Sequence, residues 1–245
     1  MKLTKDKFLI ILLFVSIILS YAVYLIPDKD YVGYLGKEDC LFENLTAVFF
    51  LVASVICFII CRAHFNIFIL LLGLLLFTGF GEEISWGQRI FNFETPESMK
   101  KINVQKEFTI HNIVYFNSVD FNMQTKTGIS RFLTINFLFK VFWFVYGVLI
   151  PLAFLFNKSF AAIANKIRFP VPKISFGIFF LFNYFIMKLL ELHLSQFSLL
   201  LDYCRTNGEI YECLAALIFM IICYDFYKQR TNFDIKPKLK EKITV

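Results

Sequence analysis

The chain has 245 residues, of which 58% are hydrophobic and 19% aromatic, and its formal net charge is +6. Soluble domains contain roughly 45 to 50% apolar residues, so this composition excludes an ordinary soluble domain. The basic residues are concentrated in a few connections and at the chain ends, so the net charge has a topological origin. No basic helix or RNA-binding motif occurs, so nucleic acid is not an expected partner.

Six apolar runs are long enough to cross a bilayer, because a transmembrane helix needs about 20 residues, with a range of roughly 17 to 25. They lie at about residues 8–26, 41–61, 65–80, 137–156, 174–192 and 210–227. The third run is the shortest and needs either Gly81 as well or local thinning of the bilayer. The sequence therefore predicts an all-α polytopic transmembrane bundle of about six spans. One transmembrane domain covers residues 1–230, and a basic tail covers residues 231–245.

The first apolar run has an alternative interpretation as a cleaved signal peptide. Its start is rich in lysine, and residues 20–22 (Ser-Tyr-Ala) resemble a small-x-small cleavage site. However, the run continues to Ile26, which makes it longer than the usual apolar region of about 7 to 15 residues. We therefore expect a retained first span, with cleavage as the alternative.

The distribution of charge orients the spans. The connection at 157–173 carries four basic residues and no acidic one, and both ends of the chain are rich in lysine. Basic residues are retained on the cytoplasmic side, so both termini are predicted to lie in the cytoplasm. In this arrangement fifteen of the nineteen acidic residues fall on the outer side of the membrane.

The outward segment at 82–136 is too long for a simple connection and is rich in apolar residues, which favours an interfacial helical loop between spans three and four. Thr95 followed by Pro96 predicts a helix start, with Thr95 as the N-cap. In such a helix three polar residues recur at i, i+4 and i+8 and share one face: Asn103, Glu107 and His111.

The candidate site begins with two adjacent carboxylates, Glu82 and Glu83, at the outer end of the third span. Carboxylates at membrane depth are costly, and so are usually paired and often functional. We interpret Glu83 as a general base or metal ligand and Glu82 as its partner. Arg89 is a candidate anion clamp. The alternative is an interfacial helix end with Trp86 as an anchor and a solvated ion pair.

A divalent metal is a candidate cofactor. Glu107 and His111 have the i, i+4 spacing at which two ligands on one helix face meet a metal. The chain has only three histidines, and His64 is predicted on the inner side, so a three-histidine zinc site is not expected. A mixed site of His111 or His193 with carboxylates suits zinc, manganese or calcium.

We expect the outer ends of several spans to contribute to one outward pocket. Acidic clusters occur at Asp39 and Glu43, at Glu82 and Glu83, near Glu191, and at Glu209 and Glu212. The predicted acid/base or ligand residues are Glu82, Glu83, Arg89, Glu107 and His111. The predicted substrate-binding residues are Trp86, Gln88, Asn103, Gln105, Asn112, Glu191 and Glu212. If the outer side is oxidising, Cys40 and Cys204 are the favoured pair for a disulfide.

Three short segments resemble a group of bacterial integral membrane proteins. They are residues 81–89 (Gly-Glu-Glu-Ile-Ser-Trp-Gly-Gln-Arg), 103–107 (Asn-Val-Gln-Lys-Glu) and 111–112 (His-Asn). The resemblance implies a multi-pass protein of the bacterial inner membrane and carries no activity with it. Residues 39–44 (Asp-Cys-Leu-Phe-Glu-Asn) are faintly similar to an acidic helix start of alkaline ceramidases. Those hydrolases use three histidines and about seven spans, and this chain departs from both features.

The leading functional hypothesis is a membrane-embedded hydrolase or transferase that acts on a membrane lipid or a lipid-linked substrate from the outer leaflet. The alternative is an accessory or scaffold protein that presents the outward loop to a partner. A transporter is less favoured, because the inner halves of the spans carry few polar residues.

Overall fold

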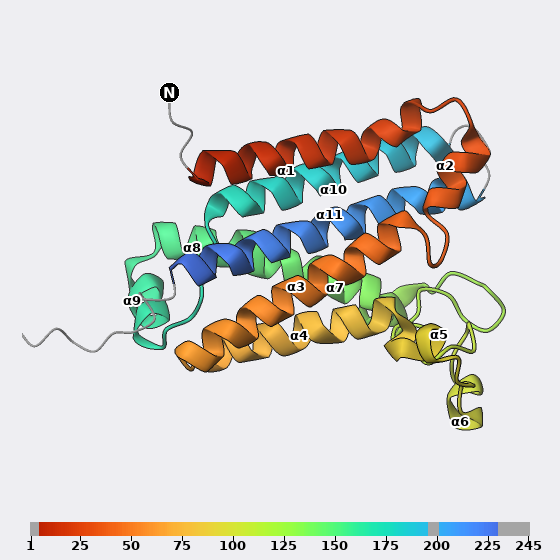
Figure 1. Cartoon of the computed structure of the whole chain (residues 1–245), viewed down its shortest axis with the longest axis horizontal. Coiled ribbons are helices and arrows are strands. Elements are labelled where there is room, and N and C mark those ends of the chain that lie inside the picture. The colour runs from red at the N-terminus through yellow and green to blue at the C-terminus, as the bar shows by residue number, and fades with distance from the viewer. Residues whose placement is uncertain (1–4, 196–200, 230–245) are drawn as a thin grey trace, which may run out of the picture.

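The computed structural model describes residues 5–195 and 201–229, and regular structure in this part of the chain is helical throughout (Figure 1). The long helices are α1 (Lys5–Tyr21), α3 (Leu41–Ala63), α4 (Ile67–Glu83), α10 (Ile174–Ser195) and α11 (Leu201–Lys228). A further long helical segment consists of α7 (Ile135–Phe144) and α8 (Ile150–Phe156), which are joined without a break. Short helices lie between them: η1 (Ala22–Leu25), α2 (Lys29–Leu35), η2 (Ser85–Gly87), α5 (Gln88–Phe91), α6 (Glu97–Lys100), η3 (Gly128–Leu133), the π turn η4 (Val145–Leu149) and α9 (Lys158–Lys166).

Five helical segments in the described residues are long and apolar enough to cross a membrane. They are Lys7–Leu25, Leu41–Ala63, Ile135–Phe156, Ile174–Leu194 and Asp202–Lys228. These segments confirm an all-helical protein compatible with a membrane. The remaining predicted span corresponds to α4, which has 17 residues and is shorter than the other five. The fifth segment begins eight residues earlier than the sequence predicts, so Glu209 and Glu212 lie within α11.

Helix α11 is the centre of the bundle. It packs against α3, α10, α1 and α2, and α4 lies alongside α3 (Figure 1). Most of α11 is buried in the bundle, and Ile210, Ala215 and Ile218 on it are completely buried. Helix α1 is part of this packing, because Leu13 and Ile17 are also completely buried and the Tyr21 hydroxyl donates to Asn183 Oδ1 at 2.9 Å.

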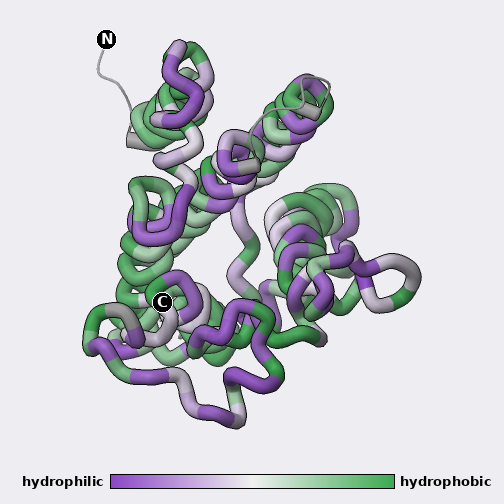
Figure 2. Tube along the Cα trace, turned by 90° about the vertical axis from the view of Figure 1, so that its right-hand side faces the viewer, coloured by the Kyte–Doolittle hydropathy of each residue, from purple (hydrophilic) through white to green (hydrophobic). Residues whose placement is uncertain are grey.

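The helices run between two ends of different character. The beginning of α1, helix α9 and the end of α11 lie at one end, whereas α5, α6 and the loop around them lie at the other (Figure 1). Seen from this second end, the connections are mainly hydrophilic and the helices behind them mainly hydrophobic (Figure 2). The connection at 157–173, which the charge pattern assigns to the cytoplasmic side, thus lies at the same end of the bundle as the beginning of α1 and the end of α11. The predicted outer loop lies at the opposite end.

A π turn shapes the helix that faces α4. Pro151 has no N–H to donate to the Gly147 carbonyl four residues earlier, and the widened turn η4 lies at this position. Helix α10 approaches the turn so closely that a Cβ on Gly177 would lie 2.3 Å from the Gly147 oxygen. A glycine is therefore required at position 177 for α10 to pack here.

The predicted amphipathic helix through the outer loop is wrong. Helix α6 covers only four residues, and Thr95 does not cap it. From Lys101 the chain proceeds through turns, with an isolated antiparallel bridge between Asn103 and Ile113. The reason is local: Asn103 Oδ1 accepts from the backbone N–H groups of Gln105 at 2.9 Å and Glu107 at 3.3 Å. Such bonds offer the backbone an alternative to helix.

The predicted disulfide between Cys40 and Cys204 is also wrong, since every cysteine is free and all six lie in the described residues. Cys40 lies at the N-cap of α3. Cys204 packs instead with a separate apolar cluster that contains Val32, Leu194 and Tyr203. The two cysteines therefore belong to different local structures.

Candidate functional site

The end of α4 reverses direction sharply and brings Trp86 back over the helix. Ser85, Trp86 and Gly87 all have positive φ angles, of 48°, 50° and 82°. Residues other than glycine adopt this region at a cost, and such strain often accompanies functional sites. The turn lays the Trp86 ring on Gly81, where a Cβ would lie 2.9 Å from the ring. Gly81 is thus the residue that allows the indole to reach the Glu82 carboxylate.

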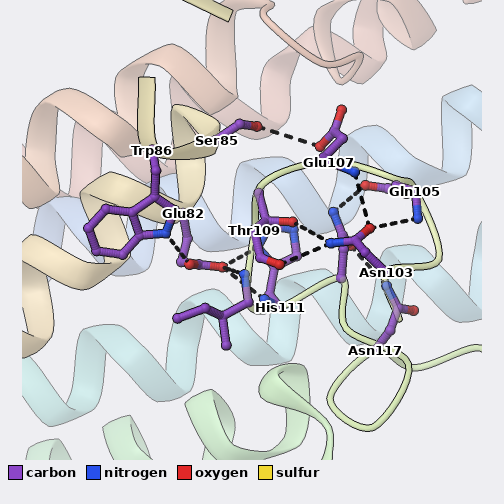
Figure 3. Close-up of polar contacts among 11 residues, drawn as sticks. Glu82, Ser85, Trp86, Asn103, Gln105, Glu107, Thr109, His111 and Asn117 are labelled. Carbon is purple, nitrogen blue, oxygen red and sulfur yellow. Dashed lines mark hydrogen bonds and ion pairs between the residues drawn. The ribbon is translucent and has the colours of Figure 1, made fainter. Parts of the chain in front are cut away.

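Glu82 is the anchor between α4 and the outer loop (Figure 3). Its Oε1 accepts from Trp86 Nε1 at 2.5 Å. Its Oε2 accepts from the backbone N–H groups of Ile110 and His111, both at 2.8 Å, and lies 3.0 Å from His111 Nδ1. A carboxylate can only accept, so the neutral form of His111 donates its Nδ1–H to Glu82. Its Nε2 then carries the free lone pair, as in the histidine–carboxylate pairs of hydrolases.

Buried amide side chains hold the loop that carries His111. Asn103 is 1% exposed and donates to the Thr109 carbonyl at 3.0 Å, while Asn112 donates to Gln105 Oε1 and accepts from Asn117 Nδ2 at 2.9 Å (Figure 3). Gln88 donates to Thr95 Oγ1 and accepts from the Phe108 N–H at 2.7 Å. Three of the predicted substrate-binding residues, Gln88, Asn103 and Asn112, therefore maintain the loop by hydrogen bonding within the protein.

A cavity of about 520 Å³ lies beside this loop. This volume is within the range of roughly 300 to 1,000 Å³ that ligand pockets occupy. Its polar lining residues are Lys37, Glu38, Glu43, Thr78, Glu82, Glu83, Ser85, Gln105, Glu107, His111, Asn136, Arg205, Glu209 and Glu212. Its other lining residues are Gly36, Phe50, Leu75, Leu76, Gly79, Ile110, Ile135, Leu138, Phe139, Phe142 and Phe219.

The polar and apolar parts of the cavity are arranged in layers along the helices. On three helices a lining glutamate is followed, seven residues deeper into the bundle, by a lining apolar residue: Glu43 and Phe50 on α3, Glu82 and Leu75 on α4, and Glu212 and Phe219 on α11. Seven residues are two helical turns, so each pair shares a face at a separation of roughly 10 Å. The cavity therefore has a carboxylate-lined mouth and an apolar interior.

The pKa values of Glu82 and Glu83, which lie beyond the apolar run that ends at Phe80, are shifted in opposite directions. Burial of Glu82 raises its pKa, but the hydrogen bonds from His111 and Trp86 outweigh burial and lower this pKa below its usual 4.5. Burial of Glu83 raises its pKa well above 4.5, and the nearby Glu212 carboxylate raises it further. Two carboxyl groups whose pKa values are pushed apart are suited to opposite roles in proton transfer.

Two cations also line the mouth, and both have an acidic partner. Lys37 Nζ lies 3.2 Å from Asp202 Oδ2, and Arg205 Nη2 lies 3.8 Å from Asp202 Oδ1. Asp202 itself does not line the cavity. Glutamates therefore outnumber cations at the mouth, among the side chains that the structure describes.

The structure brings most of the predicted acid/base residues together. Glu82, Glu83, Glu107, His111 and Glu212 line the same cavity, and Gln105 joins them. The side chain of Arg89 lies outside the described residues, so its predicted role as an anion clamp stays a prediction. Trp86 contacts the site through its bond to Glu82.

Of the two residues expected to contribute from the later spans, Glu212 lines the cavity and Glu191 does not. Its carboxylate bonds Lys188 Nζ at 2.5 Å, and its side chain is 55% exposed. One helical turn separates the two residues, so a local ion pair accounts for them.

Several lining residues are not predicted from the sequence. Lys37, Arg205 and Asn136 are among them, and so is the apolar interior. The seven-residue spacing between outer glutamates and apolar residues is present in the sequence and could have indicated the layered cavity. The two cations carry no comparable signal, because their positions depend on how α2 and α11 pack.

The described residues contain no group of three or more histidine, cysteine, aspartate or glutamate side chains arranged to hold a metal ion. The predicted Glu107–His111 ligand pair loses its basis, because these residues are not in a helix. The two side chains line the cavity from a loop of irregular turns instead.

Comparison of the chain with protein-family models, with curated proteins and with solved structures gave no match. The resemblance of the segments at 81–89 and 103–112 to a group of bacterial membrane proteins therefore stays a prediction. Evidence about function comes from the fold and from the geometry of the cavity.

Proposed function

We propose that this protein is a membrane-embedded hydrolase or transferase that acts on a lipid or lipid-linked substrate bound in the cavity between α3, α4, α7 and α11. The headgroup lies at the carboxylate-lined mouth, and the hydrocarbon chain lies in the apolar interior. The substrate is drawn from the membrane in which the protein is embedded.

The layered lining of the cavity is the observation that carries this proposal. A ligand that matches it needs a polar end and an apolar end roughly 10 Å apart, as the spacing of Glu82 from Leu75 and of Glu212 from Phe219 indicates. Lipids have such a polar headgroup joined to an apolar chain. A wholly polar substrate would leave Phe50, Phe142 and Phe219 in contact with water or empty space.

The chemistry we propose is general acid–base catalysis. The oxygen of water, or of an acceptor hydroxyl, attacks the electrophilic atom of the substrate while His111 Nε2 accepts the proton of that oxygen. The bond between the electrophilic atom and the leaving oxygen then breaks. Glu83 donates a proton to the leaving oxygen, a role that suits a carboxyl group whose pKa is raised by burial. Glu82 acts as a positioning residue, because its contacts fix the orientation of the His111 ring.

The test is turnover of a panel of radiolabelled bacterial lipids by the purified full-length protein in nanodiscs. We expect one lipid class to be consumed, and we expect His111→Gln and Glu83→Gln to reduce the rate by about 10²- to 10⁴-fold, the usual contribution of general acid–base groups. The matched control is Glu97→Gln, which removes an exposed carboxylate paired with Lys100 on the same loop. Equal rates in Glu97→Gln and His111→Gln would contradict the proposal.

The alternative function is an accessory protein that presents the outer loop to a partner. Large apolar side chains on this loop are exposed: Phe91 at 78%, Tyr115 at 71% and Ile129 at 82%. Such residues also suit the membrane interface. Serine substitution at Phe91 and Ile129 separates the two functions, because loss of a co-purifying protein with lipid turnover unchanged would favour the accessory role.

We further propose a six-span topology in the bacterial inner membrane, in which α4 crosses as the third span and both termini are cytoplasmic. Support comes from the four basic residues in the connection at 157–173, and from Arg62 and the lysines of both chain ends, all of which this topology assigns to the cytoplasmic side. A reporter that is active only in the cytoplasm should give a signal when it is fused after Asn157 or after Lys228. An extracytoplasmic signal at either position would contradict this orientation.

A further inference from the structure

Both sides of the cavity between α4 and α7 end in exposed leucines. Leu75 on α4 is 47% exposed and Leu138 on α7 is 43% exposed, yet both line the cavity. Each side chain therefore contacts the cavity and also the surroundings of the bundle. In a membrane those surroundings at this depth are hydrocarbon, because Leu75 lies two turns, or roughly 10 Å, inward of Glu82.

The walls elsewhere are closed by helix packing. Helix α4 packs along α3, and α3 packs along α11. The wall between α7 and α11 is closed by side chains, because the Phe142 ring stacks on Phe219 with 5.5 Å between centroids and Trp143 Nε1 donates to the Tyr211 hydroxyl. No comparable contact joins α4 to α7 in the part of the chain that the structure describes. On the closed walls the lining residues Phe50 and Phe219 are 7% and 0% exposed.

The end of the cavity that faces the outer loop is unsuited to a hydrocarbon chain. Gln105, Glu107, Ile110 and His111 of the loop line it there, together with the outer glutamates. A chain that entered past these groups would have to cross a polar layer. A chain that entered past Leu75 and Leu138 would stay in contact with apolar surface throughout.

We propose that the α4–α7 opening is a lateral portal, through which the hydrocarbon chain of a bilayer lipid enters the cavity past Leu75 and Leu138 while the headgroup remains at the outer mouth. This inference rests on the proposed function and adds the route of entry.

The test is photo-crosslinking of the full chain in nanodiscs of phosphatidylethanolamine and phosphatidylglycerol that contain a phosphatidylcholine with a diazirine in one acyl chain. After illumination, mass spectrometry of peptides locates the labelled residues. We expect label on Phe142 and Phe219 in the interior of the wild-type cavity. We also expect label on Leu71, an exposed residue of α4 that lies outside the cavity lining and reports lipid contact in every sample.

The portal is examined with Leu75→Trp and its matched control Leu74→Trp. Both leucines are on α4 and both are 47% exposed, but only Leu75 lines the cavity. An indole at position 75 should reduce interior labelling by roughly tenfold, which corresponds to about 1.4 kcal/mol, whereas Leu74→Trp should leave it unchanged. Leu138→Trp with Val141→Trp, which is also exposed and outside the lining, repeats the comparison on α7.

The outcomes separate the portal from the proposed function. Equal interior labelling in Leu75→Trp, Leu138→Trp and their controls would overturn the portal and leave lipid binding intact. Absence of interior labelling in the wild-type protein, with Leu71 labelled, would overturn both. Reduced interior labelling in the two lining variants alone supports the portal, provided that their thermal unfolding matches that of the controls.

Discussion

Replacement of Glu82 by alanine should loosen the loop that carries His111. The carboxylate accepts four hydrogen bonds, from Trp86 Nε1, from the backbone N–H groups of Ile110 and His111, and from His111 Nδ1. A hydrogen bond to a charged group contributes roughly 1.5 to 3 kcal/mol. Water replaces part of this contribution, since Ile110 and the His111 side chain are each 40% exposed. We therefore expect a net loss of about 2 to 4 kcal/mol in the free energy of loop opening.

Hydrogen exchange measured by mass spectrometry in nanodiscs reports this opening directly. The loss corresponds to a decrease in amide protection at Ile110 and His111 of roughly 30- to 700-fold. The control is Glu97→Ala, which removes an exposed carboxylate that bonds Lys100 and should change protection by less than about 0.5 kcal/mol. Unchanged protection at Ile110 and His111 in the Glu82 variant would refute the assignment of Glu82 as the loop anchor.

Two further predictions concern the buried carboxylate of Asp225 and the pH dependence of Glu82. Asp225→Asn should lower the free energy of unfolding by about 1 to 3 kcal/mol. Asp225 is 2% exposed, and its carboxylate accepts from Lys173 at 2.8 Å and from Gln229 at 2.6 Å. The loss is limited because water can hydrate Lys173 in the variant. Asp202→Asn, at a half-exposed pair, should cost less than about 1 kcal/mol, so equal shifts in thermal unfolding would contradict this comparison. Burial raises the pKa of Glu82, but hydrogen bonds hold it below 4.5, so its contribution to stability is present above pH 4.5 and is lost as the pH falls through the folded pKa. Trp86 fluorescence should therefore change below pH 4.5 in the wild-type protein and not in Glu82→Gln; a transition above pH 6 would contradict the sign of this shift.

The helical spans are predictable because bilayer thickness and backbone hydrogen bonding restrict what an apolar run can do. Five of the six predicted spans correspond to helices long enough to cross. The predicted start of α11 is too late, because Asp202, Arg205 and Glu209 interrupt the apolar pattern although the helix continues through them. Hydropathy reports the part of a helix that lies in lipid and not where the helix begins.

The candidate site is predictable in its residues but not in its local structure. Adjacent carboxylates at the end of a span indicate a polar site, and Glu82, Glu83 and His111 do line one cavity. The contact between Glu82 and His111 could not be derived from the helical spacing of Glu107 and His111, because the loop is not a helix there. It depends on Asn103, whose side chain bonds to the backbone of the next few residues and redirects the chain.

The central claim is that a lipid occupies the layered cavity, and an electron cryo-microscopy map of the full chain in lipid nanodiscs, bound to an antibody fragment for size, tests it most directly. The account predicts density for one hydrocarbon chain between Phe50, Phe142 and Phe219. That density should enter past Leu75 and Leu138, with the headgroup within about 3.2 Å of His111 Nε2. A map in which Glu82 holds His111 as described, while the apolar interior is closed by repacked side chains or contains no chain density, would contradict the claim.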